Sequence, residues 1–160
     1  MRMSRGIEWA VHCCLNLAWA GPEEAVPANR LANFYDLPTA YLNKQIQALV
    51  RAGIASSVSG PRGGFRLARP PERISLLDIV TAIEGPDPAF RCAEIRQQGP
   101  FGGDQESVTG RCLVDQAMRR AELAWRRELA AQTIADLTEA VEREAPGVPG
   151  RTHRWFSSNT

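Results

Sequence analysis

Residues 37–67 read LPTAYLNKQIQALVRAGIASSVSGPRGGFRL, and this stretch decides the fold. A helix is predicted to begin at Thr39, after the break at Tyr35–Pro38, and to end at Gly53, because glycine commonly follows a helix C-terminus. Apolar residues recur on one face of this helix at three- and four-residue spacing: Leu42, Ile46, Leu49 and Val50. The opposite face is polar, so one side of the helix is predicted to be buried and the other exposed.

A two-stranded wing is predicted directly after this helix. Residues 54–58 and 65–68 are short strand-like runs, and they flank the glycine-rich tip 59–64. Two helices are predicted upstream, at residues 5–19 and 28–34. The order helix, short turn, helix, wing is that of a winged helix-turn-helix domain.

A further helix is predicted to begin after Ser75, a favourable N-cap residue, and to end at Gly85. It completes a winged helix-turn-helix domain that we assign to residues 1–85. The fold class is therefore mainly α with a small β wing.

The C-terminal half is predicted to contain a functional loop and a dimerisation helix. Residues 86–112 lack periodicity and form a loop too long to be a simple connector. Residues 113–145 are predicted to form one long amphipathic helix, from Leu113 to about Glu144. At about 1.5 Å rise per residue, this helix is longer than the diameter of a small domain. It is therefore predicted to pack against its copy in a second subunit. Residues 146–160 are expected to form a flexible tail.

Composition and charge exclude some classes of protein. The chain has 160 residues with 44% hydrophobic and 23% charged residues, which is ordinary for a globular protein. No apolar run approaches the length of a membrane helix, so no membrane association and a cytoplasmic location are expected. Residues 1–70 hold eight Lys and Arg against four acids, a balance of +4, whereas the remainder carries −3. A basic N-terminal half favours a polyanionic partner.

The predicted partner is double-stranded promoter DNA, bound by the polar face of the 39–51 helix. Asn and Gln pair with adenine, and Lys contacts guanine or phosphate, while a wing-tip arginine suits a minor groove. A two-fold dimer would present two such helices to successive major grooves. The predicted DNA-contacting residues are Thr39, Tyr41, Asn43, Lys44, Gln47 and Arg62.

Several motifs in this stretch resemble the Rrf-type winged-helix transcription regulators typified by IscR and NsrR. The matching motifs are Tyr41-Leu42, Ala52-Gly53-Ile54 and Gly60-Pro61-Arg62-Gly63-Gly64, followed by residues 76–80 and 83–85. The resemblance covers residues 1 to about 145. It implies a DNA-binding homodimer with crossed C-terminal helices and, in most members, a cluster held in the loop before that helix.

The cysteines depart from the usual family pattern. IscR-like and NsrR-like members place three cysteines close together in that loop, whereas this loop has only Cys92 and Cys112, twenty positions apart. In the first helix, Glu8 and His12 are spaced i and i+4 on one face, which suits two ligands of one metal.

The segments GIEWAVHCC (6–14) and GPDPAFRCAEIRQQGP (85–100) resemble the redox-sensing RsrR branch of the family. This resemblance implies a [2Fe–2S] cluster held by Cys92 and Cys112 of one subunit together with Glu8 and His12 of the other. The sequence is therefore identified as a redox-sensing transcription regulator, expected to act as a repressor.

The chemistry of this ligand set is reasonable for a redox sensor. Thiolates are the standard cluster ligands, and imidazole replaces thiolate in Rieske centres, where it raises the potential. A carboxylate is a hard donor that favours ferric iron, so Glu8 is expected to make the site sensitive to reduction. Trp9 is expected to shield the cluster from water. Cys13 and Cys14 are interpreted as packing residues, as buried free cysteines commonly are.

Three alternatives to a cluster-based switch stay open from the residues alone. Cys92 and Cys112 could form a thiol–disulfide switch on the same fold. Glu8, His12 and the same two cysteines could complete a tetrahedral zinc site. A winged-helix protein-interaction module would not need the polar face or Arg62, and an enzyme is disfavoured because no cofactor motif or nucleophile–base pair is present.

Overall fold

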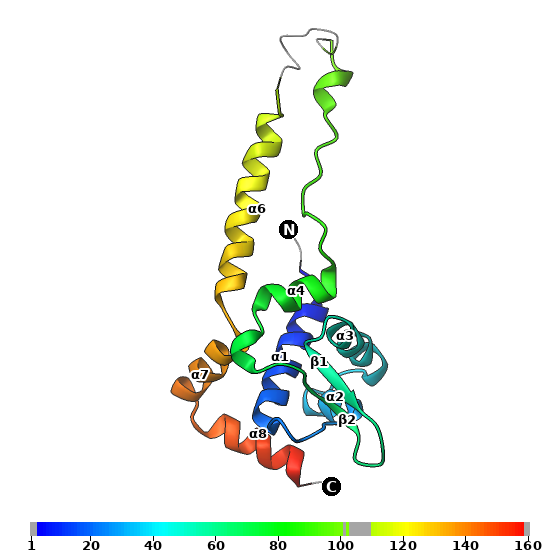
Figure 1. Cartoon of the computed structure of the whole chain (residues 1–160), viewed down its shortest axis with the longest axis vertical. Coiled ribbons are helices and arrows are strands. Elements are labelled where there is room, and N and C mark those ends of the chain that lie inside the picture. The colour runs from blue at the N-terminus through cyan, green and yellow to red at the C-terminus, as the bar shows by residue number, and fades with distance from the viewer. Residues whose placement is uncertain (1–2, 101, 103–109, 159–160) are drawn as a thin grey trace. The chain divides into compact units, whose positions relative to one another are not determined.

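The predicted helix-turn-helix is present in the computed structural model (Figure 1). Helix α2 spans Ala28–Phe34 and α3 spans Thr39–Arg51. The structure describes residues 3–100, 102 and 110–158; residues 101 and 103–109 of the predicted cluster-binding loop lie outside it. The described chain divides into two units, one of residues 87–128 and one made of the segments on either side.

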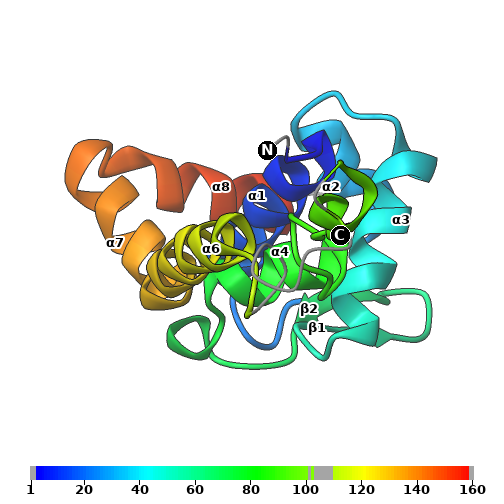
Figure 2. The same cartoon turned by 90° about the horizontal axis from the view of Figure 1, so that it is seen from above.

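Helix α1 (Arg5–Ala20) is the centre of the winged-helix unit. It contacts α3, α4 (Leu76–Glu84), α7 (Ile134–Glu144) and α8 (Gly147–Ser157). Figure 2 shows α1 between α8 and α3. Cys13 and Cys14 are fully buried in two different core clusters, one with Leu17 and one with Ala10. The interpretation of both cysteines as packing residues is confirmed.

The wing is an antiparallel pair of strands, β1 (Ala55–Val58) and β2 (Gly64–Leu67). Its two adjacent glycines are required by close backbone contacts. A Cβ on Gly63 would lie 2.3 Å from the carbonyl oxygen of Val58, and one on Gly64 would lie 2.4 Å from the backbone of Val26. Val26 and Phe65 exchange backbone hydrogen bonds of 2.9 Å, which join the wing to the segment before α2.

Helix α4 begins directly after Ser75, as predicted, and follows a short 3-10 turn, η1 (Pro71–Arg73). The Ser75 hydroxyl accepts from the backbone N–H of Asp78 at 3.1 Å, and the Asp78 carboxylate accepts from the N–H of Ser75 at 2.9 Å. This reciprocal capping box satisfies two backbone donors that a helix start otherwise leaves free.

The single long helix predicted from Leu113 to Glu144 is wrong. The structure has two helices, α6 (Leu113–Ala131) and α7 (Ile134–Glu144), separated at Gln132 and Thr133. Thr133 and Asp136 form a capping box that begins α7. The backbone N–H of Ile134 donates to the carbonyl oxygen of Ile74, and Ile134 is fully buried in the winged-helix core. Ile134 is therefore a core residue of its own chain and unavailable to a dimer interface.

The flexible tail expected after residue 145 is also wrong, because Gly147–Ser157 form helix α8. Phe156 is 2% exposed and stacks on Phe34 of α2 with ring centroids 5.3 Å apart. The Arg30 guanidinium donates to the carbonyl oxygens of Trp155 and Phe156, where a cation complements the negative end of the helix dipole. The C-terminal helix is thus part of the winged-helix core.

The unit of residues 87–128 pairs an extended segment with α6. The segment leads into the 3-10 turn η2 (Ile95–Gln98). At its start, the Arg126 guanidinium donates to the carbonyl oxygen of Asp87 at 3.5 Å, and within α6 Arg126 also bonds Glu122 at 2.9 Å. None of the helices in the described ranges is long and apolar enough to span a membrane.

Candidate functional site

Cys92 and Cys112 lie together at the end of the 87–128 unit where α6 begins. The two thiol sulfurs and a carboxylate oxygen of Glu94 all lie within 4.8 Å of one another. Cys112 is the residue before α6, so its sulfur meets the free N–H groups of the first helical turn. Hydrogen bonds from the backbone of Asp115 and then Val114 lower the pKa of the Cys112 thiol, with smaller contributions from Cys92 and Arg96. The fold therefore favours the thiolate, the form that binds metals and attacks disulfides.

Glu94 is a site residue that the sequence analysis missed. Its backbone is left-handed (φ 48°, ψ 47°), an uncommon conformation for a residue other than glycine. The Nε and Nη2 of Arg96 each donate a hydrogen bond to one carboxylate oxygen of Glu94. The Nη2 also donates to the carbonyl oxygen of Gly110 at 3.2 Å. Arg96 thereby joins the extended segment that bears Cys92 to the segment that leads from Gly110 to Cys112. The spacing Cys-x-Glu was the only sequence signal for Glu94.

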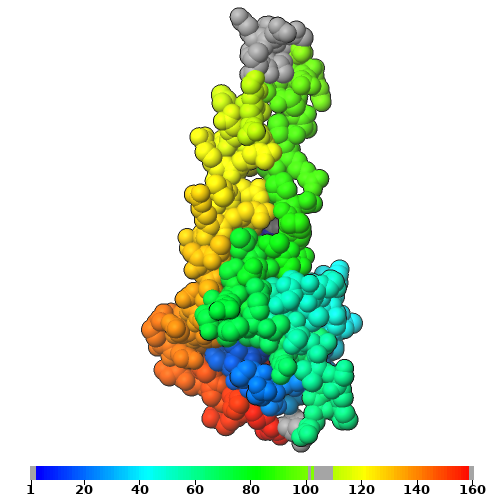
Figure 3. Space-filling model, in the orientation of Figure 1, coloured from blue at the N-terminus to red at the C-terminus, as the bar shows by residue number. Residues whose placement is uncertain are grey.

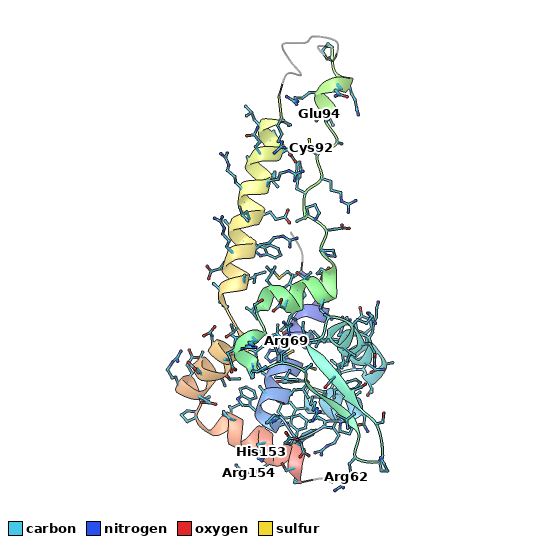
Figure 4. All side chains as sticks on the ribbon, in the orientation of Figure 1. Arg62, Arg69, Cys92, Glu94, His153 and Arg154 are labelled. Atoms are coloured by element: carbon cyan, nitrogen blue, oxygen red, sulfur yellow. The ribbon has the colours of Figure 1, made fainter. Side chains whose placement is uncertain are left out.

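A small hollow of about 260 Å³ lies beside the two cysteines, between the extended segment and the start of α6. Asp115 lines it and is 5% exposed. One of its carboxylate oxygens accepts from Arg119 at 2.7 Å, while Oδ1 is buried and has no hydrogen-bond partner among the residues that the structure describes. Figure 4 labels Cys92 and Glu94 on the extended segment. Two thiols beside a carboxylate and a hollow form a donor set that fits an iron or zinc centre.

Glu8 and His12 are exposed on one face of α1, in the winged-helix unit. The Nδ1 of His12 lies 3.3 Å from the Tyr35 hydroxyl, which donates to Oδ1 of Asn16 at 3.3 Å. This contact engages one ring nitrogen of His12 and holds the imidazole in a fixed orientation, with Nε2 as the other possible ligand atom. A hydrogen bond to one ring nitrogen that orients the ring is typical of metal-binding histidines.

The predicted DNA-contacting residues share an exposed face of α3, apart from one on the wing. Thr39, Tyr41, Lys44 and Gln47 are exposed, and Asn43 is half-buried. Arg62 lies in the turn between β1 and β2, at the wing tip (Figure 4). The structure thus brings the α3 residues together and brings Cys92 to Cys112. Glu8 and His12 belong to the other unit from the cysteines, so their joint ligation stays a prediction.

Comparison with known families decides the class of this protein. The family model Rrf2, described as an iron-dependent transcriptional regulator, matches residues 3–140. This chain belongs to the Rrf2 family. It is a DNA-binding transcriptional regulator, and its relatives include HTH-type transcriptional regulators. Helix α8 lies beyond the range that the Rrf2 model matches.

Relatives of this Rrf2-family chain include regulators from several bacteria. The regulator BadM of Rhodopseudomonas palustris is 40% identical over 84 residues, which cover 52% of this chain and 53% of BadM. The regulator YffB of Lactococcus lactis is 30% identical over 142 residues, 89% of this chain and 90% of YffB. The regulator IscR of Cereibacter sphaeroides is 31% identical over 113 residues, 69% of this chain and 73% of IscR.

Solved structures confirm the predicted fold of the Rrf2-family chain. CymR, the global cysteine regulator of B. subtilis, superposes with a TM-score of 0.69 at 21% identity, covering 88% of this chain and 98% of CymR. IscR of T. potens superposes with a TM-score of 0.67 at 22% identity, covering 91% of each chain. The mainly helical fold with a two-stranded wing is therefore confirmed.

Proposed function

We propose that this Rrf2-family regulator senses redox state through a [2Fe–2S] cluster ligated by Cys92 and Cys112 of one protomer and by Glu8 and His12 of the partner subunit. The observation that carries the proposal is the meeting of the two cysteines at the N-terminus of α6, where backbone N–H groups stabilise the Cys112 thiolate. A second support is His12, whose Nδ1 lies 3.3 Å from the Tyr35 hydroxyl, so that Nε2 is the ring nitrogen not engaged by Tyr35. Bound there, the cluster would supply one-electron redox chemistry.

The ligands from two subunits require a dimer, and α6 offers the surface for it. Its apolar stripe includes Val114 and Met118, which are 61% and 42% exposed in the monomer. Figure 3 shows part of the α6 surface in yellow. Exposed apolar residues at helical spacing are typical of a helix that packs against a partner. The stripe consists of Val114, Met118, Ala121, Trp125 and Leu129.

Met118→Glu is expected to convert the dimer to monomer, because it buries an unpaired carboxylate in the apolar interface. Light scattering on the purified variant measures this. Arg120→Glu is the matched control, since Arg120 is exposed on the opposite side of α6 and should leave the dimer intact. A dimer that survives Met118→Glu would move the interface away from this stripe.

The α3 face and the wing are proposed to bind operator DNA. We expect Lys44→Gln and Arg62→Gln each to weaken DNA binding. If the lost contact is to a phosphate, the slope of log affinity against log salt concentration becomes shallower by about one. If it is to a base, specificity relaxes at one position of the operator. Fluorescence anisotropy with operator and random DNA over a range of salt concentrations measures both. Arg127→Gln is the control, because Arg127 is an exposed arginine of α6, outside α3 and the wing. Unchanged affinity and salt slope in both variants would place the DNA face elsewhere.

Helix α1, which carries the proposed ligands Glu8 and His12, contacts helix α3 of the proposed DNA-binding face directly. Trp9, next to Glu8 on α1, meets Tyr41 of α3 edge-to-face with ring centroids 5.3 Å apart. Tyr41 is one of the exposed residues of the predicted DNA face. A change in the position of Glu8 or His12 would therefore reach Tyr41 through one aromatic contact. Such a contact can bias operator binding only if the two redox states favour different arrangements of it.

A thiol–disulfide switch is the second candidate, because the Cys112 thiol is hydrogen-bonded to Cys92 and is stabilised as a thiolate. A visible spectrum of the anaerobically purified protein separates the two. A red-brown protein with charge-transfer absorption supports the cluster. A colourless protein that forms an intramolecular Cys92–Cys112 disulfide on oxidation would replace the cluster with the thiol switch.

A further inference from the structure

We propose that Cys92, Glu94 and Cys112 form a mononuclear site for a thiophilic divalent cation, of the class of Zn²⁺, within a single protomer. This site differs from the cluster site proposed above in two ways. Its carboxylate comes from Glu94 of the same chain, and it needs no residue of the partner subunit. The two thiols would then have a second metal-bound state, available to a chain before it dimerises.

The spacing of the three donors fits one ion. Zinc binds thiolate at about 2.3 Å and carboxylate oxygen at about 2.0–2.2 Å, so ligand atoms around one tetrahedral ion lie about 3.5–4 Å apart. The three donor atoms already lie within 4.8 Å of one another. Small side-chain rotations would close the remaining gap, since Cys92 is exposed and Cys112 and Glu94 are half-buried.

Arg96 acts as a positioning residue for the Glu94 carboxylate. The Arg96 guanidinium donates one hydrogen bond to each carboxylate oxygen of Glu94 and so uses one lone pair on each. An ionised carboxylate has about four lone pairs that can accept. Lone pairs therefore remain for a metal ion, and the carboxylate is held in one orientation. Metal-binding carboxylates are commonly fixed by such a hydrogen bond from a neighbouring residue. The left-handed backbone at Glu94 places this side chain beside the cysteines at some conformational cost.

The charges of the site are balanced by the same arginine. Two thiolates and a carboxylate around a divalent ion leave one excess negative charge, and the Arg96 guanidinium supplies one positive charge at hydrogen-bond distance. The hollow beside the cysteines leaves room for a fourth ligand, such as water. Three protein ligands with one open position are a common zinc arrangement.

Titration of the reduced, iron-free full-length chain with Co²⁺ tests this inference, because thiolate–Co²⁺ charge-transfer absorption reports sulfur ligation directly. One Co²⁺ per chain is expected, displaceable by Zn²⁺. Glu94→Gln is expected to lower the affinity at least about tenfold, and Arg96→Gln by about 10- to 100-fold. Arg91→Gln is the matched control, because Arg91 is an exposed arginine of the same segment paired with Asp87.

Two outcomes would overturn the inference: Co²⁺ affinity unchanged in Glu94→Gln, or affinity lost in Glu8→Gln instead, which would assign the carboxylate to α1. The test is independent of the cluster proposal. A colourless anaerobic wild-type protein would count against the cluster and leave the Co²⁺ titration interpretable. A red-brown protein without a Co²⁺ site in its iron-free form would count against this inference alone.

Discussion

Cys92→Ala is expected to abolish the visible absorption of the anaerobically purified protein completely. Cys92 is one of the two thiols that the structure brings to the start of α6. Thiolates are the standard ligands of a [2Fe–2S] cluster, so the loss of this thiolate is expected to prevent cluster binding. The measurement is the visible spectrum together with iron and sulfide content per chain. We expect both contents to fall to background, while circular dichroism stays helical because Cys92 is exposed and outside the core.

Cys13→Ala is the matched control for Cys92→Ala. Burial raises the pKa of the Cys13 thiol to about 12, so this thiol stays protonated and inert. Its side chain packs in the winged-helix core, and the variant is expected to keep full absorption at some loss of stability. Absorption that persists in Cys92→Ala would remove Cys92 from the ligand set and with it the proposed centre.

Operator affinity is expected to differ between the oxidised and reduced protein by about 5- to 150-fold, the range of typical couplings between two sites. The oxidised form is expected to bind more tightly. A cluster held by Glu8 would gain negative charge on reduction, which would weaken ligation by the Glu8 carboxylate, a hard donor that favours ferric iron. Helix α1 would then relax at the contact between Trp9 and Tyr41 of α3. Anaerobic anisotropy with dithionite-reduced and reoxidised protein measures both affinities, and the spectrum recorded alongside shows that the cluster remains intact.

Two variants sharpen the redox experiment. Glu8→Gln keeps the size of the side chain and removes its charge, so it is expected to shrink the difference between the two redox states. Glu24→Gln, which neutralises an acid outside α1, should leave that difference as it is in the wild type. Equal affinities in the two wild-type states, or affinity lost only together with the cluster, would replace redox switching with cluster-loss sensing.

Local features of the sequence were sufficient to predict the winged helix-turn-helix. Ser75 caps α4 through a residue three positions away, and the glycines at 63 and 64 stand where the wing passes close to the backbone of Val58 and Val26. The helical spacing of apolar residues likewise located α1 and α3. Such signals act over a few residues, and they can therefore be read without knowledge of the rest of the chain.

Two features of the fold depended on tertiary structure. The break between α6 and α7 has a local capping signal at Thr133, but the backbone bonds of Gln132 and Ile134 to the segment around Ile74 anchor it. Helix α8 forms against Phe34 and Arg30, which lie more than a hundred residues earlier. The spacing of apolar residues continues across Gln132 and Thr133, so it does not predict a break there. The sequence of residues 147–157 likewise does not show which distant residues it packs against. The break and helix α8 are both stabilised by contacts between residues far apart in the sequence.

The candidate metal centre was likewise predicted in part from the sequence and completed only by the tertiary structure. The residue types and the family motifs were enough to single out Cys92, Cys112, Glu8 and His12 as candidate ligands. Only the folded chain placed Cys92 beside Cys112 and added Glu94, because that arrangement depends on Arg96 bonding both to Glu94 and to the carbonyl oxygen of Gly110. A side chain that bridges two segments leaves no periodic trace in either of them, so its role became visible only in three dimensions.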